Sequence, residues 1–561
     1  ISEAQSLRRI NIAILDTAQM VPARLVPDSR RLSCLLPLLL LALPAILCQL
    51  LGSRPGAAFA GGPLARWLTA KPMLPNGVVA PCRCTPDVLL QEQPGSSEQL
   101  SYDWRERWYA VCFEENAPVR GARKPNSVSI FDEPLVLFRD REGRLSCLED
   151  RCAHRAAKLS EGQVVDGQLE CLYHGWKFEG CGRCSSIPQL DASIPKAATR
   201  RGYPVEVREG IVWVYMGISD ASTRKSPPVS ADDLDKHTGF DTYSFQVDLP
   251  YDSTFLAENL LDPAHIPVSH DATPGGGKKA NAQPLAMEVL ETTSEGLKGR
   301  FRNTRRKDPS VEGPWTSLDL EAPGIVRFRA NPKPGLVFGA ALHCMPLGKG
   351  RARLLFRIYS RFPGALGLIV KLRNLKPNFL RHLSSCVILE QDAGLITSQE
   401  DRIRRTGLSP KADWLPLKTS DTMLVAYRRW LDRVGHGMPH YIGWARMSAG
   451  DSVELVGDAL ERPVDSEHRS GRSRFDRHVL HCATCKQALR RTRLAKSAFS
   501  WLVVVGGVSL AAAALVLPQF SRPRAILSAL ACLGLPLFGC AAAGRLERAF
   551  YVNYRRHPEL A

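Results

Sequence analysis

The chain has 561 residues, which is too long for one ordinary domain and allows two or three. Its 44% hydrophobic and 23% charged content are typical of a globular protein, and its sixteen widely spread cysteines argue against a disulfide scaffold. The net charge of +18 would suit nucleic acid, but basic residues crowd positions 462–496 just before an apolar region. We therefore predict a membrane surface, and not nucleic acid, as a partner.

The first hundred residues look like targeting sequence. Leu32–Leu51 is almost wholly apolar after two arginines, and Ala58-Phe59-Ala60 is a small-x-small site of the kind signal peptidase cuts. We assign 1–60 as a signal or targeting segment, with a retained N-terminal anchor as the alternative. Residues 61–100 are rich in Gly, Pro, Ala and Arg and are assigned as a transit or linker segment.

Short β-type runs such as Pro134–Phe138 and Gly210–Tyr215, separated by turn residues, predict a small all-β domain over 101–220. It surrounds two mixed pairs, Cys152-x-His154 and, sixteen residues later, Cys171-x-x-His174. Two thiolates hold one iron of a [2Fe–2S] cluster while two imidazoles hold the other. A structural zinc site is the alternative, but each pair mixes one Cys with one His and Gly175-Trp176 follows directly, which favours the cluster.

A second cysteine pair, Cys181-x-x-Cys184, follows in a glycine-rich turn. It is either a redox pair or a turn that happens to carry two thiols, and the sequence leaves both interpretations open.

A polar linker over 218–240 precedes a second constellation. Asp252-Ser253 caps a predicted helix, and Asp262-Pro-Ala-His265 and His270 follow it. Non-haem Fe(II) enzymes that use O₂ need two His and one carboxylate on one face of the metal, so His265 and His270 are candidate ligands. Asp262 has a plainer alternative as the N-cap of a restarted helix.

The third ligand must be a distant carboxylate. Alternating stretches at 326–329 and 356–362 predict an antiparallel sheet, and a helical stretch follows over 387–400. Asp392 lies inside an apolar run of this stretch, where an unpaired carboxylate would be costly, and metal ligation accounts for it. We assign 221–410 as a catalytic iron domain.

The C-terminal part begins with an extension over 411–498 that carries Cys482-x-x-Cys485, which is either two incidental thiols or a thiol pair open to thioredoxin-type control. Two uncharged stretches follow within 499–543, at Phe499–Leu517 and Ala525–Ala543, each near the length that crosses a bilayer. We predict a transmembrane helical hairpin, with a buried core hairpin as the alternative. Basic residues before it and in the tail 544–561 place both flanks on the same, positive side of the membrane.

These motifs resemble those of the Rieske non-haem iron oxygenases over roughly residues 100–410. The resemblance rests on the Cys/His pairs, on Glu258-Asn259-x-x-Asp262-x-x-His265-x-x-x-x-His270, and on Gln391-Asp392. It implies an α+β fold, in which an all-β Rieske [2Fe–2S] domain accompanies a helix-grip catalytic domain with an antiparallel sheet and a long helix. It also implies a homotrimer in which the cluster of one subunit serves the iron of its neighbour, with Asp262 linking the two sites.

The turn around Cys181 and Cys184, the late Cys482-x-x-Cys485 and the paired C-terminal anchor narrow the resemblance to the plastid branch. This branch includes pheophorbide a oxygenase, the protochlorophyllide-dependent translocon component and the inner-envelope translocon Rieske protein. It implies a monooxygenase driven by reduced ferredoxin, with O₂ as co-substrate and a chlorophyll-derived tetrapyrrole as substrate. The first expectation is opening of the pheophorbide a macrocycle, and the alternatives are chlorophyllide or protochlorophyllide a oxygenation and phyllobilin hydroxylation. The expected location is the plastid inner envelope or thylakoid membrane, with the catalytic domain and the positive flanks of the hairpin on the stromal side.

Two hypotheses from other classes are weaker. One is a non-catalytic redox sensor of the envelope import machinery, and the complete iron triad argues against it. The other is a quinol-oxidising electron-transfer protein, which the loops exclude because they lack an extra cysteine pair just after the ligands.

Overall fold

The computed structural model describes residues 101–219, 225–230, 240–273, 276–304, 313–333, 335–448, 473–516 and 523–554. The predictions for residues 1–100, for most of the linker over 218–240 and for the turn between the two apolar C-terminal stretches lie outside the described residues. The chain divides into two compact units, one formed by 82–499 with 537–561 and the other by 1–81 with 500–536.

The predicted all-β domain consists of three small antiparallel sheets. The first has the order β1-β11-β10, the second β2-β3-β4-β9 and the third β5-β6-β7-β8. The strands are β1 Trp108–Phe113, β2 Asn126–Ile130, β3 Glu133–Arg139, β4 Leu145–Glu149, β5 Gln163–Val165, β6 Gln168–Glu170, β7 Lys177–Phe178, β8 Cys184–Ser186, β9 Gly202–Tyr203, β10 Val205–Arg208 and β11 Ile211–Tyr215. The second cluster loop belongs to the third sheet, because Cys171 follows β6, whereas the loop with Cys152 connects β4 of the second sheet to β5 of the third. Cys152 and Cys171 pack in the same hydrophobic core.

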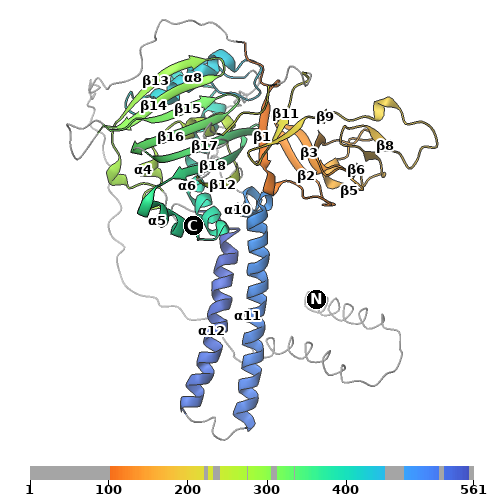
Figure 1. Cartoon of the computed structure of the whole chain (residues 1–561), viewed down its shortest axis with the longest axis vertical. Coiled ribbons are helices and arrows are strands. Elements are labelled where there is room, and N and C mark those ends of the chain that lie inside the picture. The colour runs from red at the N-terminus through yellow and green to blue at the C-terminus, as the bar shows by residue number, and fades with distance from the viewer. Residues whose placement is uncertain are drawn as a thin grey trace, which may run out of the picture. The chain divides into compact units, whose positions relative to one another are not determined.

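The catalytic domain is built on one seven-stranded antiparallel sheet, drawn in green in Figure 1, with the order β12-β18-β17-β16-β15-β14-β13. Its strands are β12 Asp241–Leu249, β13 Leu285–Thr293, β14 Gly296–Asn303, β15 Thr316–Glu321, β16 Ile325–Lys333, β17 Leu336–Gly348 and β18 Arg351–Arg361. The first strand of the sheet in chain order, β12, pairs with the last, β18. The helices that follow these two strands therefore lie near the same strands. The predicted α+β class is confirmed.

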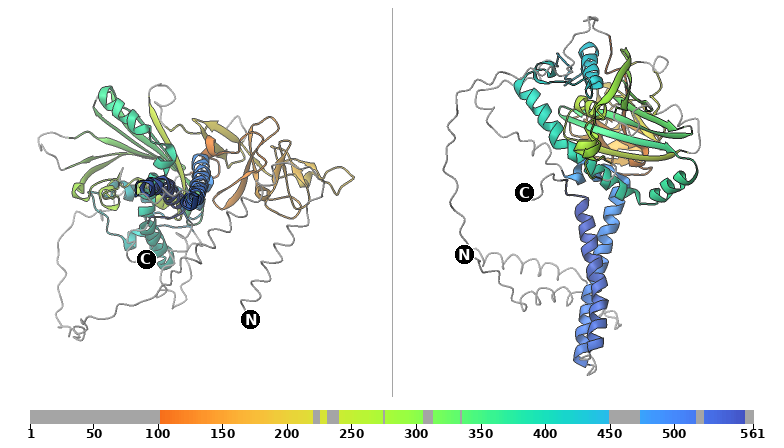
Figure 2. Two further views of the ribbon diagram at one scale, coloured as in Figure 1. Left: turned by 90° about the horizontal axis from the view of Figure 1, so that it is seen from below. Right: turned by 90° about the vertical axis from the view of Figure 1, so that its left-hand side faces the viewer.

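Two helical segments place the iron ligands. Helix α3, Ser253–Leu260, begins where the Asp252 side chain accepts a hydrogen bond of 2.8 Å from the backbone N–H of Thr254, as the capping pattern predicts. The short helix α4, Ile266–Ser269, restarts after Pro263. The long helix α6, Asn378–Thr406, ends at Gly407 with φ of 66°, a left-handed cap that glycine adopts without strain. Figure 2 shows α6 and the sheet from two further sides.

The remaining helices of this unit are α5 Gly364–Asn374, α7 Pro410–Asp413 and α8 Thr422–Val434. α8 contacts β13 and β14, and it buries Met423, Tyr427 and Trp430 in the same core as the aromatic side chains of β12 and α3. Residues 411–434, which follow the predicted catalytic domain, therefore help to form its core.

The C-terminal segment contains α10 Arg474–Arg477, α11 Ala483–Val516 and α12 Pro523–Ala549. Among the described residues, α11 is the one helix that is long and apolar enough to cross a membrane, by length and composition alone. It contains nearly all of the first predicted apolar stretch and also extends back to the Cys482-x-x-Cys485 motif. The second predicted stretch lies within α12.

Candidate active site and cluster site

The two Cys/His loops meet as the spacing predicts. Cys152 and Cys171 are only 3% and 1% exposed, whereas His154 is exposed and His174 is half-buried. The Nδ1 atoms of the two imidazoles face each other at 3.2 Å. The structure thus presents two buried sulfurs and two outward imidazoles, which is the donor set of a Rieske cluster with an accessible edge for electron entry.

The surroundings fit a bound cluster. Burial raises the pKa of the Cys152 thiol to about 11, while the backbone N–H groups of His154 and Arg155 act in the opposite direction. A thiolate at this position therefore needs a compensating cation, which cluster iron supplies. The Trp176 ring stacks on the His154 ring with centroids 4.9 Å apart and so fixes its plane.

The segment with Pro188 and Gln189, which follows the Cys181/Cys184 turn, packs against the second ligand loop. Gln189 donates a hydrogen bond of 2.8 Å to the carbonyl oxygen of His174. Gly175 has φ of +75°, and a Cβ added there would lie 3.0 Å from Pro188. The close approach of Pro188 to the ligand loop therefore favours glycine after His174.

The second site joins the two ends of one short helix to one side chain of the long helix α6. His265 precedes α4, His270 follows it and Asp392 comes from α6. Oδ2 of Asp392 lies 3.2 Å from Nε2 of His270 and 3.7 Å from Nε2 of His265. His270 and Asp392 are 4% and 3% exposed. The three donor atoms converge, so they fit the two-His, one-carboxylate set that holds non-haem iron with open positions.

The second ring nitrogen of each imidazole, Nδ1, also has a partner. Nδ1 of His265 lies 3.3 Å from Oδ2 of Asp262, and Nδ1 of His270 donates to Oε1 of Gln391 at 2.9 Å. Burial lowers the pKa of His265, but the two nearby carboxylates outweigh it and leave the pKa raised. These contacts turn both Nε2 atoms toward Asp392.

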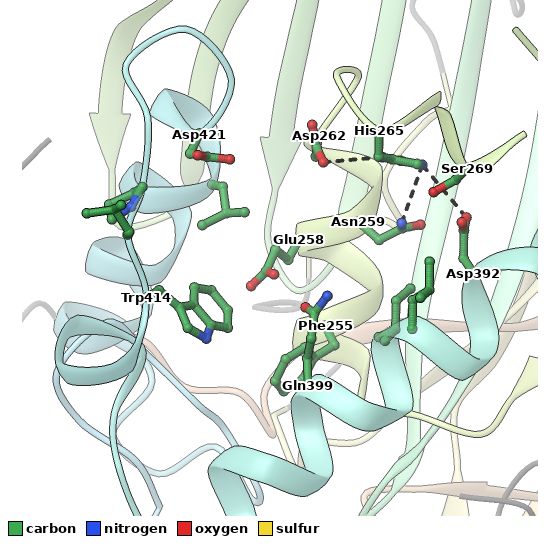
Figure 3. A pocket seen from close by; sticks show the side chains of 15 residues that line it. Phe255, Glu258, Asn259, Asp262, His265, Ser269, Asp392, Gln399, Trp414 and Asp421 are labelled. Carbon is green, nitrogen blue, oxygen red and sulfur yellow. Dashed lines mark hydrogen bonds and ion pairs between the residues drawn. The ribbon is translucent and has the colours of Figure 1, made fainter. Parts of the chain in front are cut away.

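A pocket of about 440 Å³ opens beside the triad, within the usual size of small-molecule sites. Figure 3 shows His265 and Asp392 on one side and Trp414 and Asp421 across from them. Burial raises the pKa of Glu258, which also lines this space, against the opposing effect of Arg428. The apolar lining of the pocket consists of Phe255, Leu395, Ile396, Trp414, Leu415, Pro416 and Leu424.

Gln391 is expected to tune iron affinity through His270. Gln391→Leu removes the acceptor for Nδ1 of His270, so iron affinity should fall by about 10–100-fold, as measured by competition with a chelator. Gln391→Glu keeps an acceptor oxygen and should retain most of the affinity. Ser398→Ala, at an exposed position on the same helix, is the control. Unchanged affinity in Gln391→Leu would contradict the assigned contact.

The two cysteine pairs have different surroundings. Cys181 is exposed with its sulfur 3.8 Å from Glu179, whereas Cys184 is buried and its thiol donates to the carbonyl of Ser186 at 3.6 Å. Cys482 and Cys485 are both buried. A hydrogen bond from the Cys485 thiol, together with the nearby imidazoles, lowers the pKa of Cys482, and the same shared proton raises the pKa of Cys485.

The sequence does not reveal several residues that position others. Gln391 belongs to the Gln391-Asp392 motif, but its spacing does not indicate a bond to His270. His382 and His478, which lie against the late cysteine pair, belong to none of the motifs named above. The nearness of His478 to Cys482 in the chain was an available signal, whereas His382 lies on α6 and carried none.

Comparison with known proteins agrees with this geometry. Residues 107–204 match the family described as Rieske [2Fe-2S] domain, and residues 321–409 match the family described as pheophorbide a oxygenase. Chloroplastic Protein TIC 55 of Pisum sativum is 35% identical over 492 residues, which cover 83% of this chain and 84% of that protein. Chloroplastic pheophorbide a oxygenase of Arabidopsis thaliana is 28% identical over 502 residues, 84% of this chain and 87% of that protein.

Among solved structures, dicamba monooxygenase bound to dicamba is 20% identical, with 59% of this chain and 96% of that chain covered and a TM-score of 0.46. The long match to Protein TIC 55 confirms the resemblance predicted from the motifs. The chain is thus an oxidoreductase whose cofactors are a Rieske [2Fe–2S] cluster and a mononuclear non-haem iron. It belongs to the plastid Rieske non-haem iron oxygenase family that includes Protein TIC 55 and pheophorbide a oxygenase.

Proposed function

We propose that this chain is a ferredoxin-dependent monooxygenase that oxidises a chlorophyll-derived tetrapyrrole. The observation that carries the proposal is the convergence of His265, His270 and Asp392 at the edge of a pocket, in a chain that also has a cluster site. A non-catalytic redox sensor has no need of three converging ligands beside a substrate-sized cavity.

The residues take the following roles. Four hold the cluster, namely Cys152, His154, Cys171 and His174, and three hold Fe(II), namely His265, His270 and Asp392. When bound, the cluster supplies single electrons and the mononuclear iron activates O₂. Oδ2 of Asp262 lies 3.3 Å from Nδ1 of His265, and Asp262 would connect this iron ligand to the hydrogen-bond path from a neighbouring cluster in the proposed homotrimer.

The pocket suits a flat, largely apolar molecule. Trp414 and its aliphatic neighbours offer a wall for a tetrapyrrole face, while Glu258 and Asp421 offer polar contacts. Pheophorbide a, opened at its macrocycle, is the first candidate substrate. Hydroxylation of a linear tetrapyrrole is the second.

The proposed location is a plastid membrane, either inner envelope or thylakoid. Helix α11 has the length and apolar composition of a membrane span, and basic side chains such as Arg490, Arg491 and Arg493 precede its apolar part. Positively charged residues beside a membrane span tend to stay on the side of the membrane that is not translocated. This tendency supports a catalytic domain on the stromal side. Reduced ferredoxin would reach the exposed His154 edge there.

Asp262→Asn is expected to slow turnover by about 10–100-fold while cluster and iron content stay unchanged. Asn keeps the side-chain oxygen that accepts the 2.8 Å bond from the backbone N–H of Ala264, so the local turn is preserved. It removes the negative charge beside His265. The measurement is turnover together with the rate at which the reduced protein is reoxidised by O₂ with substrate present. Normal reoxidation and turnover would show that Asp262 only caps the turn.

The proposed function is tested with full-length protein in detergent micelles, given ferredoxin, a reductase and O₂. Pheophorbide a, chlorophyllide a, protochlorophyllide a and a phyllobilin are supplied separately, and products are identified by mass spectrometry. With ¹⁸O-labelled O₂, a gain of 18 mass units for each inserted oxygen atom, in place of 16 with ordinary O₂, at one of these substrates supports the proposal. Oxygenation of none of them, by protein with full cluster and iron content, would overturn it.

A further inference from the structure

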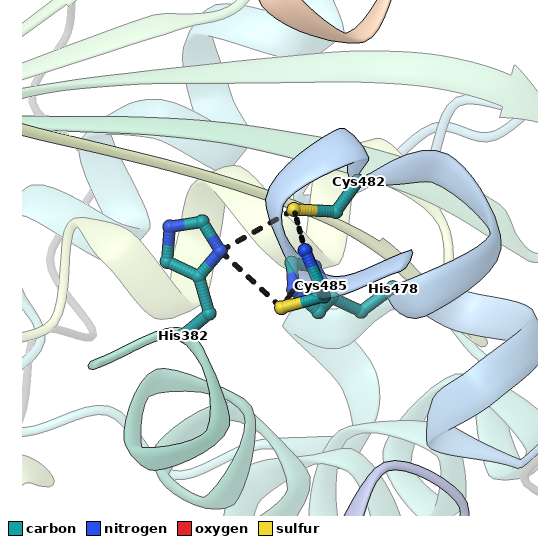
Figure 4. Close-up of side chains that lie close together, drawn as sticks. All are labelled: His382, His478, Cys482 and Cys485. Carbon is teal, nitrogen blue, oxygen red and sulfur yellow. Dashed lines mark hydrogen bonds between the residues drawn. The ribbon is translucent and has the colours of Figure 1, made fainter. Parts of the chain in front are cut away.

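Four metal-ligating side chains meet away from the active site. Figure 4 shows His382, His478, Cys482 and Cys485 directed toward one another. His382 comes from α6, His478 directly follows α10, Cys482 directly precedes α11 and Cys485 lies in its first turn. One donor atom from each lies within 4.8 Å of the others. The three segments meet only in the folded chain, so the cluster is a property of the tertiary structure.

All four side chains are removed from water, at 4%, 0%, 1% and 0% exposed in chain order. The Phe245 ring stacks on the His478 ring with centroids 4.7 Å apart, and Leu383 and Val479 belong to the surrounding apolar cluster. Solvated thiols and imidazoles need no special partners, but groups this deeply buried must be satisfied by one another or by a ligand.

The imidazole of His478 is oriented as metal-bound histidines are. Its Nδ1 lies 2.6 Å from the carbonyl oxygen of Gln246 on β12, so Nδ1 carries the proton and Nε2 is left with a lone pair. That lone pair faces Sγ of Cys485 at 3.2 Å. A backbone carbonyl holding the outer nitrogen is the arrangement that aims the inner nitrogen at a metal.

The distances among the donors fit a tetrahedral ion. Nδ1 of His382 lies 3.4 Å from Sγ of Cys482 and 3.6 Å from Sγ of Cys485. Bonds of about 2.3 Å to sulfur and about 2.0–2.1 Å to nitrogen give tetrahedral N···S edges of about 3.5 Å. The backbone N–H of Cys485 also points at Sγ of Cys482, at 3.4 Å, which stabilises a thiolate there.

We propose that His382, His478, Cys482 and Cys485 form a structural Zn²⁺ site that joins the start of α11 to α6 and β12. Two thiolates and two imidazoles, all buried and with no open side, are the donor set of closed structural zinc sites. The Cys-x-x-Cys spacing is also typical of them. The inference concerns a different site from the iron triad and does not rest on the proposed function.

Zinc binding explains this cysteine pair better than a disulfide does. A disulfide between Cys482 and Cys485 would use the two sulfurs but leave the converging nitrogens of His382 and His478 without an anionic partner. The other pair offers a contrast, because Cys181 is exposed beside Glu179 and its partner Cys184 donates to a backbone carbonyl. Of these two Cys-x-x-Cys pairs, as the structure describes them, Cys482 and Cys485 are the pair with two imidazoles against its sulfurs.

The proposed ion would hold the catalytic unit to the base of its membrane-type helix. His382 precedes Asp392 by ten residues on α6, so about 15 Å of helix separates the zinc site from the iron site. The same junction carries the buried ion pair between Arg474 and Glu390, with N···O of 2.6 Å. Zinc would therefore stabilise the packing of the first turn of α11 against α6 and β12, and it would take no part in oxygenation.

The test uses full-length protein purified in detergent without chelators and reconstituted with Zn²⁺. Elemental analysis should find about one zinc per chain, and zinc-edge X-ray absorption should show two sulfurs at about 2.3 Å and two nitrogens at about 2.0–2.1 Å. The sulfur signal separates this site from zinc misplaced in the iron triad, which has no sulfur ligand. Zinc could also occupy the cluster site, which has two sulfurs and two nitrogens of its own, so the protein used must show the full visible absorption of its [2Fe–2S] cluster. Under that condition the measurement needs no variant, so it holds even where variants fold poorly.

Variants then locate the ion. Cys482→Ser with Cys485→Ser, and His382→Gln or His478→Gln, should lose most of the sulfur-ligated zinc. The matched control, Cys181→Ser with Cys184→Ser, should keep it, and so should His265→Ala. The proposal is overturned if the wild type holds no zinc after reconstitution, if its zinc has no sulfur ligands, or if the zinc persists in the Cys482/Cys485 variant. A Cys482–Cys485 disulfide in zinc-exposed, reduced and repurified protein would also overturn it.

Discussion

Replacing Asp392 by alanine is expected to abolish oxygenation and to remove the mononuclear iron while leaving the cluster in place. Asp392 supplies the one carboxylate that meets both histidines, at 3.2 and 3.7 Å, and it is 3% exposed. Without it, two imidazoles remain, and neutral nitrogens alone hold a divalent ion weakly in a site that was built for a facial triad. His270→Ala should act in the same way.

The measurement combines turnover with iron content and the visible spectrum of the cluster. Iron should fall from about three to about two per chain, with unchanged cluster absorption. Asp271→Asn is the matched control, because this exposed neighbour of His270 only accepts a bond from the backbone N–H of Lys279. An Asp392→Ala variant that keeps its third iron and its turnover would show that the iron site is elsewhere.

Much of this arrangement could be predicted because its chemistry is local in sequence. Cys152 and His154 occupy one loop and Cys171 and His174 another, so two short motifs contain the whole donor set. Asp392 is predictable as a ligand because it lies in an apolar helical run, where a buried carboxylate is costly unless a partner binds it. The structure gives it two histidine neighbours.

What could not be predicted depends on contacts between distant segments. His382 meets Cys482 across 100 residues of chain, and no periodicity or spacing links them. The sequence predicts a C-terminal extension where α8 lies, because nothing in it indicates that Trp430 donates to the Thr293 carbonyl on β13 and packs in the catalytic core. Pairings of this kind arise from sheet order and helix packing, which a single sequence specifies only through the finished fold.

The buried ion pair between Arg428 and Glu258 provides the largest expected effect on stability. It joins α8 to α3, with Arg428 wholly buried and the Glu258 side chain 8% exposed. Arg428 also donates to the carbonyl of Ile442 and lies over the Phe255 ring, 4.4 Å from its centroid. Arg428→Met leaves a carboxylate buried without its cation, which should cost about 3–5 kcal/mol of unfolding free energy. The melting temperature should fall by on the order of 10 °C.

The loss of unfolding free energy in Arg428→Met should also depend on pH. Burial already raises the pKa of Glu258 against the opposing effect of Arg428, so losing Arg428 raises that pKa further. The folded variant then binds a proton that the unfolded chain releases above its ordinary carboxyl pKa, so its stability should decline as pH rises from about 4.5 toward neutrality. Melting measured at pH 5 and pH 8 should show the larger deficit at pH 8.

A double replacement separates the lost ion pair from general damage to the core. Glu258→Met with Arg428→Met removes both charges and should recover most of the stability, because apolar side chains of similar volume often replace a buried ion pair without loss. Arg429→Met, at the next and only half-buried position of α8, is the matched control and should change little. If the double variant is as unstable as Arg428→Met alone, the arginine acts through its bond to Ile442 and its contact with Phe255. If Arg428→Met itself melts like the wild type, the pair contributes nothing to the junction of α3 and α8.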